Sequence, residues 1–352
     1  MAHPGPQVGP ITVPPSLDNV VVATTGLSEV DGARGRLSYR GRPILEVAEQ
    51  FPTWTQLVPW LVTGRAVTHS SARAAAPELV WPTLSNPLAQ LAVLILAMGD
   101  GVPLDTPEAA AAFVQATPVW YATLRSPGVT PTPHDAAACF LEALTGRRPD
   151  PGAVAALNAY WVLAAEHSLN ASTFAVRVAA STGAQMPQAL AAGAAALSGP
   201  LHGGAPTGVL AQLQALEAAP DLEVALGDLL ERGERVMGFG HRVYRTEDPR
   251  AACLRAVLHT LTGDGEAKHA AAVESAALAV LARWKPDRPL AVNVEFYAAL
   301  VLSALGISAE DCPAVFACAR LAGWAAHYWE QRATGRLIRP LARYAPAKPQ
   351  PS

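Results

Sequence analysis

The strongest constraint on the fold of this chain is a helical spacing of apolar residues that begins at Ile44 and continues through most of the sequence. Alanine supplies 71 of the 352 residues, and it favours helices because its side chain loses no rotamer entropy there. The best candidate for β structure is residues 28–44, where alternating Leu37 and Tyr39 with turn-forming glycines predict a short hairpin or extended segment. We therefore expect a mainly α-helical protein.

Three segments carry the signatures of helix N-termini. Residues 106–108 (Thr-Pro-Glu) and 248–250 (Asp-Pro-Arg) each combine a capping side chain with a proline suited to the first helical position. Ser308, with acidic residues two and three positions later, is expected to open another helix that runs towards Gln331.

Composition excludes several classes of protein. The chain is 51% hydrophobic and 16% charged with a net charge of −3, which excludes disorder for most of it and does not suggest nucleic-acid binding. The four cysteines are scattered, so we expect neither a zinc site nor a disulfide framework. The longest strongly apolar run, Leu91 to Met98, is too short to span a bilayer, and the N-terminus lacks signal-peptide features. We expect a cytoplasmic protein with no membrane partner and with proline-rich tails at 1–17 and 346–352.

Two glycine-rich segments each hold a histidine. His202 lies in residues 198–204 and His241 in residues 237–245. Glycine lets a backbone approach a ligand closely, and histidine can donate or accept a proton near neutral pH. The G-x-G before His241 has no preceding strand and no third glycine, so we exclude a dinucleotide-binding loop.

Two further segments place polar side chains among apolar ones. His167 and Asn170 lie in residues 166–173, and Glu295 lies in residues 292–297. A carboxylate in apolar surroundings tends to have a raised pKa, which suits a general base. Taken singly, such a histidine is more often a hydrogen-bonded core residue, and such a glutamate is more often a surface residue.

Three arginines suggest what could bind. Arg250 is in the first turn after the cap at Asp248, where a helix N-terminus already favours anions, and Arg320 interrupts a long apolar helix. Arg339 follows in the segment LIRP. Any one of them could lie on a solvated face. Together with the histidines, they would suit a small dicarboxylate, because guanidinium binds carboxylate in a bidentate manner.

These segments together resemble citrate synthases of the shorter bacterial and archaeal type. The resemblance rests on LSGPLHGGA, VMGFGHRVYRTEDPRA, VNVEFY, HSLNASTF and ARLAGWAAHYWEQ…LIRP, and on the opening VDGARGRLSYRG. It extends from about Gly26 to Tyr344 and implies a two-domain helical fold with a small N-terminal β-hairpin. It also implies condensation of acetyl-CoA with oxaloacetate and water, which yields citrate and free CoA.

The resemblance implies a role for each of three catalytic residues. His202 matches the histidine that hydrogen-bonds the thioester oxygen as the enol or enolate forms. His241 matches the histidine that polarises the ketone of oxaloacetate. Glu295 stands where the family has the aspartate that removes a proton from the acetyl methyl group.

The resemblance also implies the substrate contacts. For oxaloacetate they would be His167, Asn170, Arg250, Arg320 and Arg339, of which Arg339 would reach in from the partner subunit of a homodimer. For coenzyme A they would be Arg245 and the backbone of residues 236–240, with Val236, Gly238 and Gly240. Because CoA arrives as a substrate thioester, we expect no metal and no resident organic cofactor.

Three departures from the family pattern lie near the expected site. Glu295 replaces aspartate, Pro206 and Thr207 replace an asparagine and an acidic residue, and residues 166–168 read Glu-His-Ser where Asp-His-Glu is common. These changes leave several alternatives open. The chain could be a citrate synthase, a 2-methylcitrate synthase that uses propionyl-CoA, a citryl-CoA lyase-like enzyme, or a catalytically weakened sensor of CoA or a dicarboxylate.

The resemblance implies a division into two domains. A large helical domain would contain residues 18–203 and, after the small domain at 204–311, the C-terminal helix and arm at 312–345.

Overall fold

The computed structural model describes residues 12–14, 16–17, 19–66, 84–126, 135–203, 205–217 and 219–344. These residues form fourteen helices and one three-stranded sheet, which confirms the mainly α-helical fold. The predicted tail at 346–352 and most of the tail at 1–17 lie outside the described residues, as does Gly204 at the predicted domain boundary.

The predicted β structure is confirmed as a small antiparallel sheet with the order β1 (Ser28–Asp31), β2 (Arg36–Tyr39) and β3 (Arg42–Pro43). Ser28 pairs with Tyr39, and Asp31 pairs with Arg36 at the hairpin end. The alternation of the sequence turns Leu37 and Tyr39 into the core.

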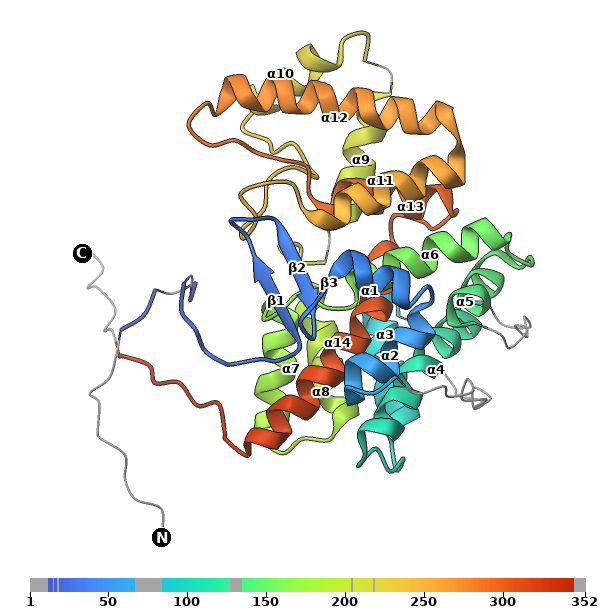
Figure 1. The fold of residues 1–352 in the computed structure, drawn as a ribbon, viewed down its shortest axis with the longest axis vertical. Helices are drawn as coiled ribbons and strands as arrows, with labels where there is room; N and C mark the ends of the chain where they lie inside the picture. Colours follow the sequence, from blue (N-terminus) through green and yellow to red (C-terminus); the bar gives the residue numbers. More distant parts are fainter. Residues whose placement is uncertain are drawn as a thin grey trace, which may run out of the picture.

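Most helices gather in the lower part of the molecule, below the sheet and around one central helix (Figure 1). They are α1 (Ile44–Gln50), α2 (Trp54–Thr63), α3 (Pro87–Gly99), α4 (Pro107–Arg125), α5 (Ala136–Thr145), α6 (Pro151–Ala164), α7 (Ala171–Ser181), α8 (Met186–Leu197) and the central α14 (Cys312–Thr334). Helix α14 contacts α2, α3, α4, α6, α7 and α8, and this is why it is buried along most of its length.

Close approach to α14 depends on glycine. A Cβ atom at Gly323 of α14 would lie 2.4 Å from the carbonyl oxygen of Ala165 and 2.3 Å from Oε2 of Glu166. The abundance of alanine has the same effect elsewhere, because small side chains let helices pack with their backbones close together.

The remaining helices gather at the upper end (Figure 1). They are α9 (Ala205–Leu216), α10 (Leu222–Glu231), α11 (Pro249–Thr262), α12 (Asp264–Trp284) and α13 (Val294–Ala304). Contacts of α11 and α13 with α6, and of α9 with α14, join the two groups. The division into domains at 204 and 311 stays a prediction.

Two predicted helix starts are confirmed and one is wrong. Thr106 Oγ1 accepts from the N–H of Ala109 at 3.1 Å, and Asp248 Oδ1 accepts from the N–H of Arg250 at 3.0 Å. Ser308 does not open the last helix, which begins at Cys312. Its hydroxyl instead bonds with Asp311 and stabilises a separate turn before the helix.

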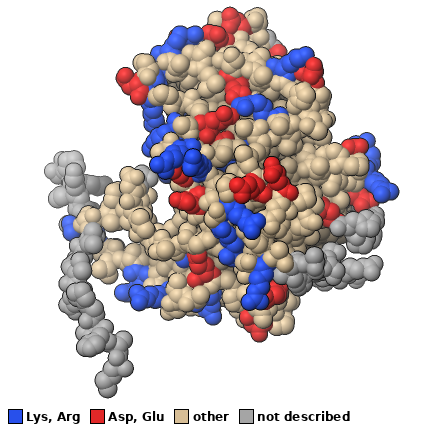
Figure 2. All heavy atoms as spheres, in the orientation of Figure 1, with Lys and Arg blue, Asp and Glu red and all other residues tan. Residues whose placement is uncertain are grey.

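Lys, Arg, Asp and Glu are interspersed over the face shown in Figure 2, as expected from the near-neutral net charge. Within the described ranges, no helix is both long and apolar enough to cross a membrane.

Candidate active site

His202 lies in the turn after α8 and faces the N-terminus of α7. Its Nε2 lies 2.8 Å from Ser172 Oγ and accepts from the N–H of Ser172 at 3.4 Å. Because a backbone N–H can only donate, Nε2 is an acceptor and the neutral ring carries its proton on Nδ1. Burial, together with the charge of Arg320, lowers the pKa of His202 to about 4. At neutral pH this half-buried ring is therefore an uncharged Nδ1–H donor.

Asn170 caps α7 and shares a hydrogen-bond network with His202. Its Oδ1 accepts from the N–H of Thr173 at 3.0 Å and lies 2.8 Å from Ser172 Oγ. Its buried Nδ2 has no hydrogen-bond partner among the described residues. An unpartnered buried donor is costly, so Asn170 has a free N–H group for a ligand.

His241 has the opposite tautomer. Its Nδ1 accepts from the backbone N–H groups of Val243 and Tyr244, at 3.0 and 3.1 Å, so the neutral ring presents an Nε2–H group. Burial, and then the positive charge of Arg250, lowers the pKa of His241 to about 4. This ring is also a neutral donor at pH 7.

His167 joins His241 in an aromatic cluster. Its ring centroid is 5.5 Å from that of His241, and its Nε2 is 3.1 Å from the hydroxyl of Tyr244. Burial and the charges of Arg250 and Arg320 hold the pKa of His167 well below its ordinary value. The three predicted histidines are thus uncharged, and the positive charge of the site resides on arginines.

Arg250 is held by its own helix cap. Its Nε and Nη2 donate to the two carboxylate oxygens of Asp248 at 3.0 and 2.7 Å, and both side chains are buried. Although burial opposes the charge, Asp248 raises the pKa of Arg250. Nη1 makes no hydrogen bond to a described residue and remains available.

Arg320 has more unused donors. Nε donates to the carbonyl oxygen of Ala164 at 2.7 Å, and the guanidinium lies 4.8 Å from the ring centroid of Phe316. The side chain is buried, but neither terminal nitrogen bonds to any residue that the structure describes. A buried guanidinium with two free nitrogens is suited to a carboxylate ligand.

Glu295 is set at the start of α13. Its N–H donates to the cap residue Asn293 at 2.9 Å, and Asn293 Nδ2 donates to the carbonyl oxygen of Gly240 at 2.8 Å. A second bond, from Gly240 N–H to Ala291 O at 2.8 Å, joins this segment to the loop that carries His241. Burial raises the pKa of Glu295 to about 7, against the opposing effect of Arg250. The carboxylate is therefore a base matched to neutral pH.

The predicted coenzyme A residues occupy different environments. Gly240 and Arg245 line a pocket together with His241, Tyr244 and Arg288. Glycine is required at position 240, where φ is +79°.

The other two predicted coenzyme A positions pack internally. Val236 is buried at 6% exposure, and Gly238 packs against Phe296, with φ at +84°. Neither lines the pocket beside Arg245.

Arg339 is not brought to the other site residues within this chain. It is exposed on the arm that follows α14, and this arm leads away from the helical body (Figure 1). Among the described residues, no hydrogen bond or ion pair involves its side chain.

Sequence reasoning missed several residues of the site. Ser172, Tyr244 and Asp248 fix His202, His167 and Arg250 respectively, yet none of them was predicted as a site residue, although Asp248 was predicted as a helix cap. Tyr244 and Asp248 lie inside the quoted motif VMGFGHRVYRTEDPRA, which is the signal that could have found them. Within the described ranges, no group of three His, Cys, Asp or Glu residues could hold a metal ion.

Comparisons with known proteins agree with this geometry. The family model "Citrate synthase, C-terminal domain" matches residues 16–341. A Mycobacterium tuberculosis protein named "Putative citrate synthase 2" is 40% identical over 96% of this chain and 94% of its own length. The 2-methylcitrate synthase of Shewanella oneidensis is 36% identical over 60% of this chain and 56% of its own length.

The fold of this chain is also similar to that of a citrate synthase of known structure. Citrate synthase from Thermoplasma acidophilum, solved in a ternary complex with carboxymethyl coenzyme A and oxaloacetate, has a TM-score of 0.83 and 26% identity to this chain. The match covers 96% of this chain and 97% of that one.

Proposed function

This chain belongs to the citrate synthase family, and we propose that it condenses acetyl-CoA with oxaloacetate to give citrate and free CoA. Members of the family are enzymes that transfer an acyl group, and the chain is an acyltransferase of this type. The observation that carries the proposal is Glu295, whose pKa burial raises to about 7 against the charges of the buried Arg250 and Arg320. Its cap residue Asn293 is hydrogen-bonded to Gly240, the neighbour of His241.

The first step is enolisation of the thioester. The Glu295 carboxylate takes a proton from the acetyl methyl group, and the electron pair moves towards the thioester oxygen. The Nδ1–H of His202 donates a hydrogen bond to that oxygen as its negative charge develops. A neutral donor that is already oriented stabilises this charge without the cost of reorganising water.

The second step forms the carbon–carbon bond. The enol carbon attacks the ketone carbon of oxaloacetate, whose oxygen takes the Nε2 proton of His241 and becomes the hydroxyl of a citryl thioester. The ring regains a proton from the water that hydrolyses the thioester. Water then attacks the thioester carbonyl, so the carbon–sulfur bond breaks and the sulfur leaves as the thiol of CoA. The reaction needs no redox partner, and we expect no resident cofactor.

Oxaloacetate is a dianion, and the site offers it matching donors. We assign its carboxylates to the free nitrogens of Arg250 and Arg320, with Asn170 Nδ2 and His167 nearby. Holding the ketone beside His241 brings the two reacting carbons to attack distance, which is a large part of what such a site contributes to rate.

We also propose a homodimer in which Arg339 completes the partner's site, since this arginine is exposed and has no partner among the residues that the structure describes in its own chain. Mixing Arg339→Ala with Glu295→Ala subunits tests the idea. If subunits exchange at random, about a quarter of the sites regain both residues, so activity should return to about that fraction. No recovery after confirmed exchange would contradict the donation of Arg339.

The reaction is tested by adding oxaloacetate and acetyl-CoA to the purified protein and following release of free thiol. Release with propionyl-CoA but not acetyl-CoA would replace the proposal with 2-methylcitrate synthesis, the alternative that the Shewanella relative supports. Cleavage of citryl-CoA without condensation would indicate a lyase. CoA binding without release of thiol from any thioester would indicate a sensor.

Glu295 makes two features of the reaction predictable. kcat/KM should rise as pH increases through about 7, because the base must be deprotonated, whereas the histidines stay neutral above about pH 5.

Glu295→Gln should lower kcat by about 10³-fold, and Glu295→Asp should preserve or raise activity. A large loss in Glu295→Asp would show a site rebuilt around glutamate.

A further inference from the structure

The β1–β2 hairpin reaches from the lower helices to the loop that precedes α11 (Figure 1). Its strands pair from Ser28 opposite Tyr39 at the base to Asp31 opposite Arg36 at the tip. The base bonds to the turn between α6 and α7, and the tip packs against residues 243–247. One small element of the fold therefore contacts both groups of helices.

The base of the hairpin holds the turn that carries His167. Ser28 Oγ donates to Glu166 Oε1 at 2.9 Å and accepts from the N–H of Ser168 at 2.9 Å. The hydroxyl of Tyr39 accepts from the N–H of Glu166 at 3.1 Å. Ser168 has a φ of +52°, which is unfavourable for a residue other than glycine, and these bonds hold the turn in that conformation. His167 lies between the two bonded residues, so the hairpin fixes its backbone.

The tip of the hairpin packs closely against the loop before α11. The carbonyl oxygen of Gly32 accepts from the N–H of Arg245 at 2.8 Å. A Cβ atom at Gly32 would lie 2.1 Å from the carbonyl oxygen of Val243, and one at Gly35 would lie 2.4 Å from Thr246 Oγ1. The two backbones can approach this closely because both turn residues are glycines.

The loop that the tip contacts also sets the ring of His241. The N–H groups of Val243 and Tyr244 donate to His241 Nδ1 at 3.0 and 3.1 Å. The hydroxyl of Tyr244 lies 3.1 Å from His167 Nε2, and the two histidine rings are 5.5 Å apart. A shift of Val243 would therefore move a donor that fixes the tautomer and the orientation of His241.

We infer that the β1–β2 hairpin is a positioning element of the reaction, which holds the turn of His167 at its base and the loop of His241 at its tip. The inference rests on the proposed function, in which both histidines contact oxaloacetate. The two histidines lie on segments that are distant in sequence and belong to different groups of helices. Their separation therefore depends on an element that contacts both segments.

Gly32→Ala tests the tip, and Gly41→Ala is its matched control. Gly32 does not have a positive φ, so the added methyl group acts through its contact with Val243. Gly41 lies in the β2–β3 turn with a φ of +77°, and a Cβ atom there would meet no atom within 4 Å, so its substitution strains the sheet without touching the loop.

We expect Gly32→Ala to lower kcat per folded enzyme by about tenfold, because His241 is displaced from the ketone of oxaloacetate. KM for oxaloacetate should change little, since Arg320 and Asn170 are untouched. Gly41→Ala should lower Tm but leave kcat unchanged. Equal kcat values for the two variants would overturn the role of the tip.

Ser28→Ala tests the base and does not depend on whether the tip accepts a methyl group. It removes the hydroxyl that bonds to Glu166 and Ser168. Ser38→Ala is the matched control, because the hydroxyl of Ser38, in β2 of the same hairpin, is buried without a partner among the described residues. We expect Ser28→Ala to raise KM for oxaloacetate by about tenfold, because His167 is less firmly held, and Ser38→Ala to leave it unchanged. An unchanged KM in Ser28→Ala contradicts the role of the base.

A second measurement separates this inference from the proposed function. Nitrogen NMR of histidine-labelled protein near neutral pH reports which ring nitrogen of His241 carries the proton, and His241→Asn assigns the signals. We expect the Nδ1 signal of His241 to shift in Gly32→Ala and to stay in place in Gly41→Ala, with the signals of His202 unchanged in both. This result supports the inference even if no thiol is ever released. A His241 signal that Gly32→Ala leaves in place contradicts it, even in an enzyme that is fully active.

Discussion

The active site and the polar network behind it are both buried and both rich in arginine and histidine, but they differ in how their hydrogen bonds are used. In the network, Arg177 donates to His327 and His327 donates to Glu166, so that every bonded donor has a protein acceptor, and Glu166 Oε2 is an acceptor without a partner among the described residues. In the site, the terminal nitrogens of Arg320 and the Nδ2 of Asn170 have no partner among the described residues. Burial of charge alone does not mark a binding site; burial with unused donors does.

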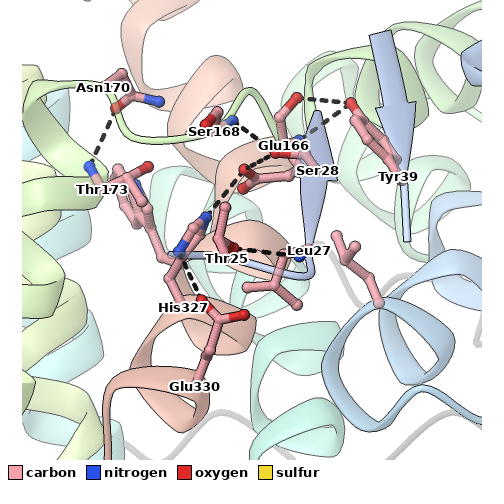
Figure 3. A network of polar contacts seen from close by, with 12 residues as sticks. Thr25, Leu27, Ser28, Tyr39, Glu166, Ser168, Asn170, Thr173, His327 and Glu330 are labelled. Atoms are coloured by element: carbon pink, nitrogen blue, oxygen red, sulfur yellow. Dashed lines mark hydrogen bonds and ion pairs between the residues drawn. The ribbon is translucent and has the colours of Figure 1, made fainter. Parts of the chain in front are cut away.

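In the network behind the site, the buried donors bond to other protein groups (Figure 3). Arg177 Nη1 donates to His327 Nδ1 at 2.9 Å, so His327 carries its proton on Nε2 and donates it to Glu166 at 3.0 Å. Ser28 Oγ also donates to Glu166, and it accepts from the N–H of Ser168. The network thereby fixes the turn that carries His167 and Asn170.

The largest expected effect is on stability. Arg177→Met leaves Glu330 and the Nδ1 of His327 without their buried donor, and it should lower the free energy of unfolding by about 3–5 kcal/mol. Denaturant unfolding measures the change. A loss below 1 kcal/mol would mean that the network is dispensable and that the contrast with the site is false.

Arg320→Met should affect substrate binding far more than stability, which is the reverse of what we expect for Arg177→Met. Its terminal nitrogens bond to no described residue, so the free energy of unfolding should change much less than in Arg177→Met. KM for oxaloacetate should rise about a hundredfold, because a buried charge partner of the substrate is lost. Steady-state kinetics and unfolding of the same preparation give both values. An unchanged KM would remove Arg320 from the substrate site.

The smallest effect concerns the backbone beneath Glu166. Gly323→Ala places a methyl group against Glu166 and Ala165 and should cost about 1–3 kcal/mol by overpacking. Gly227→Ala is the control, since no atom lies within 4 Å of a Cβ atom there, and it should stabilise α10 by about 0.5–1 kcal/mol. Equal effects of the two substitutions would show that the contact at Gly323 relaxes freely.

Much of the local structure follows from sequence patterns. The caps at Thr106 and Asp248 were predictable because a capping side chain and a following proline act within one turn. The prediction that Ser308 opens the last helix was wrong because its hydroxyl donates to Asp311 instead of capping the helix. The terminal nitrogens of Arg320, which bond to no described residue, have no local signal in the sequence, since their surroundings depend on helices that are distant in sequence.

The sequence by itself determined the mainly helical fold, the small hairpin, the family and the identity of the histidines and arginines of the site. These depend on periodicity, turn chemistry and motif residues, which are local properties. Only the tertiary structure decided which histidine nitrogen carries the proton, which arginine donors stay unused and why Glu295 has a pKa of about 7. Tautomer, pairing and desolvation depend on groups brought together by packing, and a linear pattern does not encode those distances.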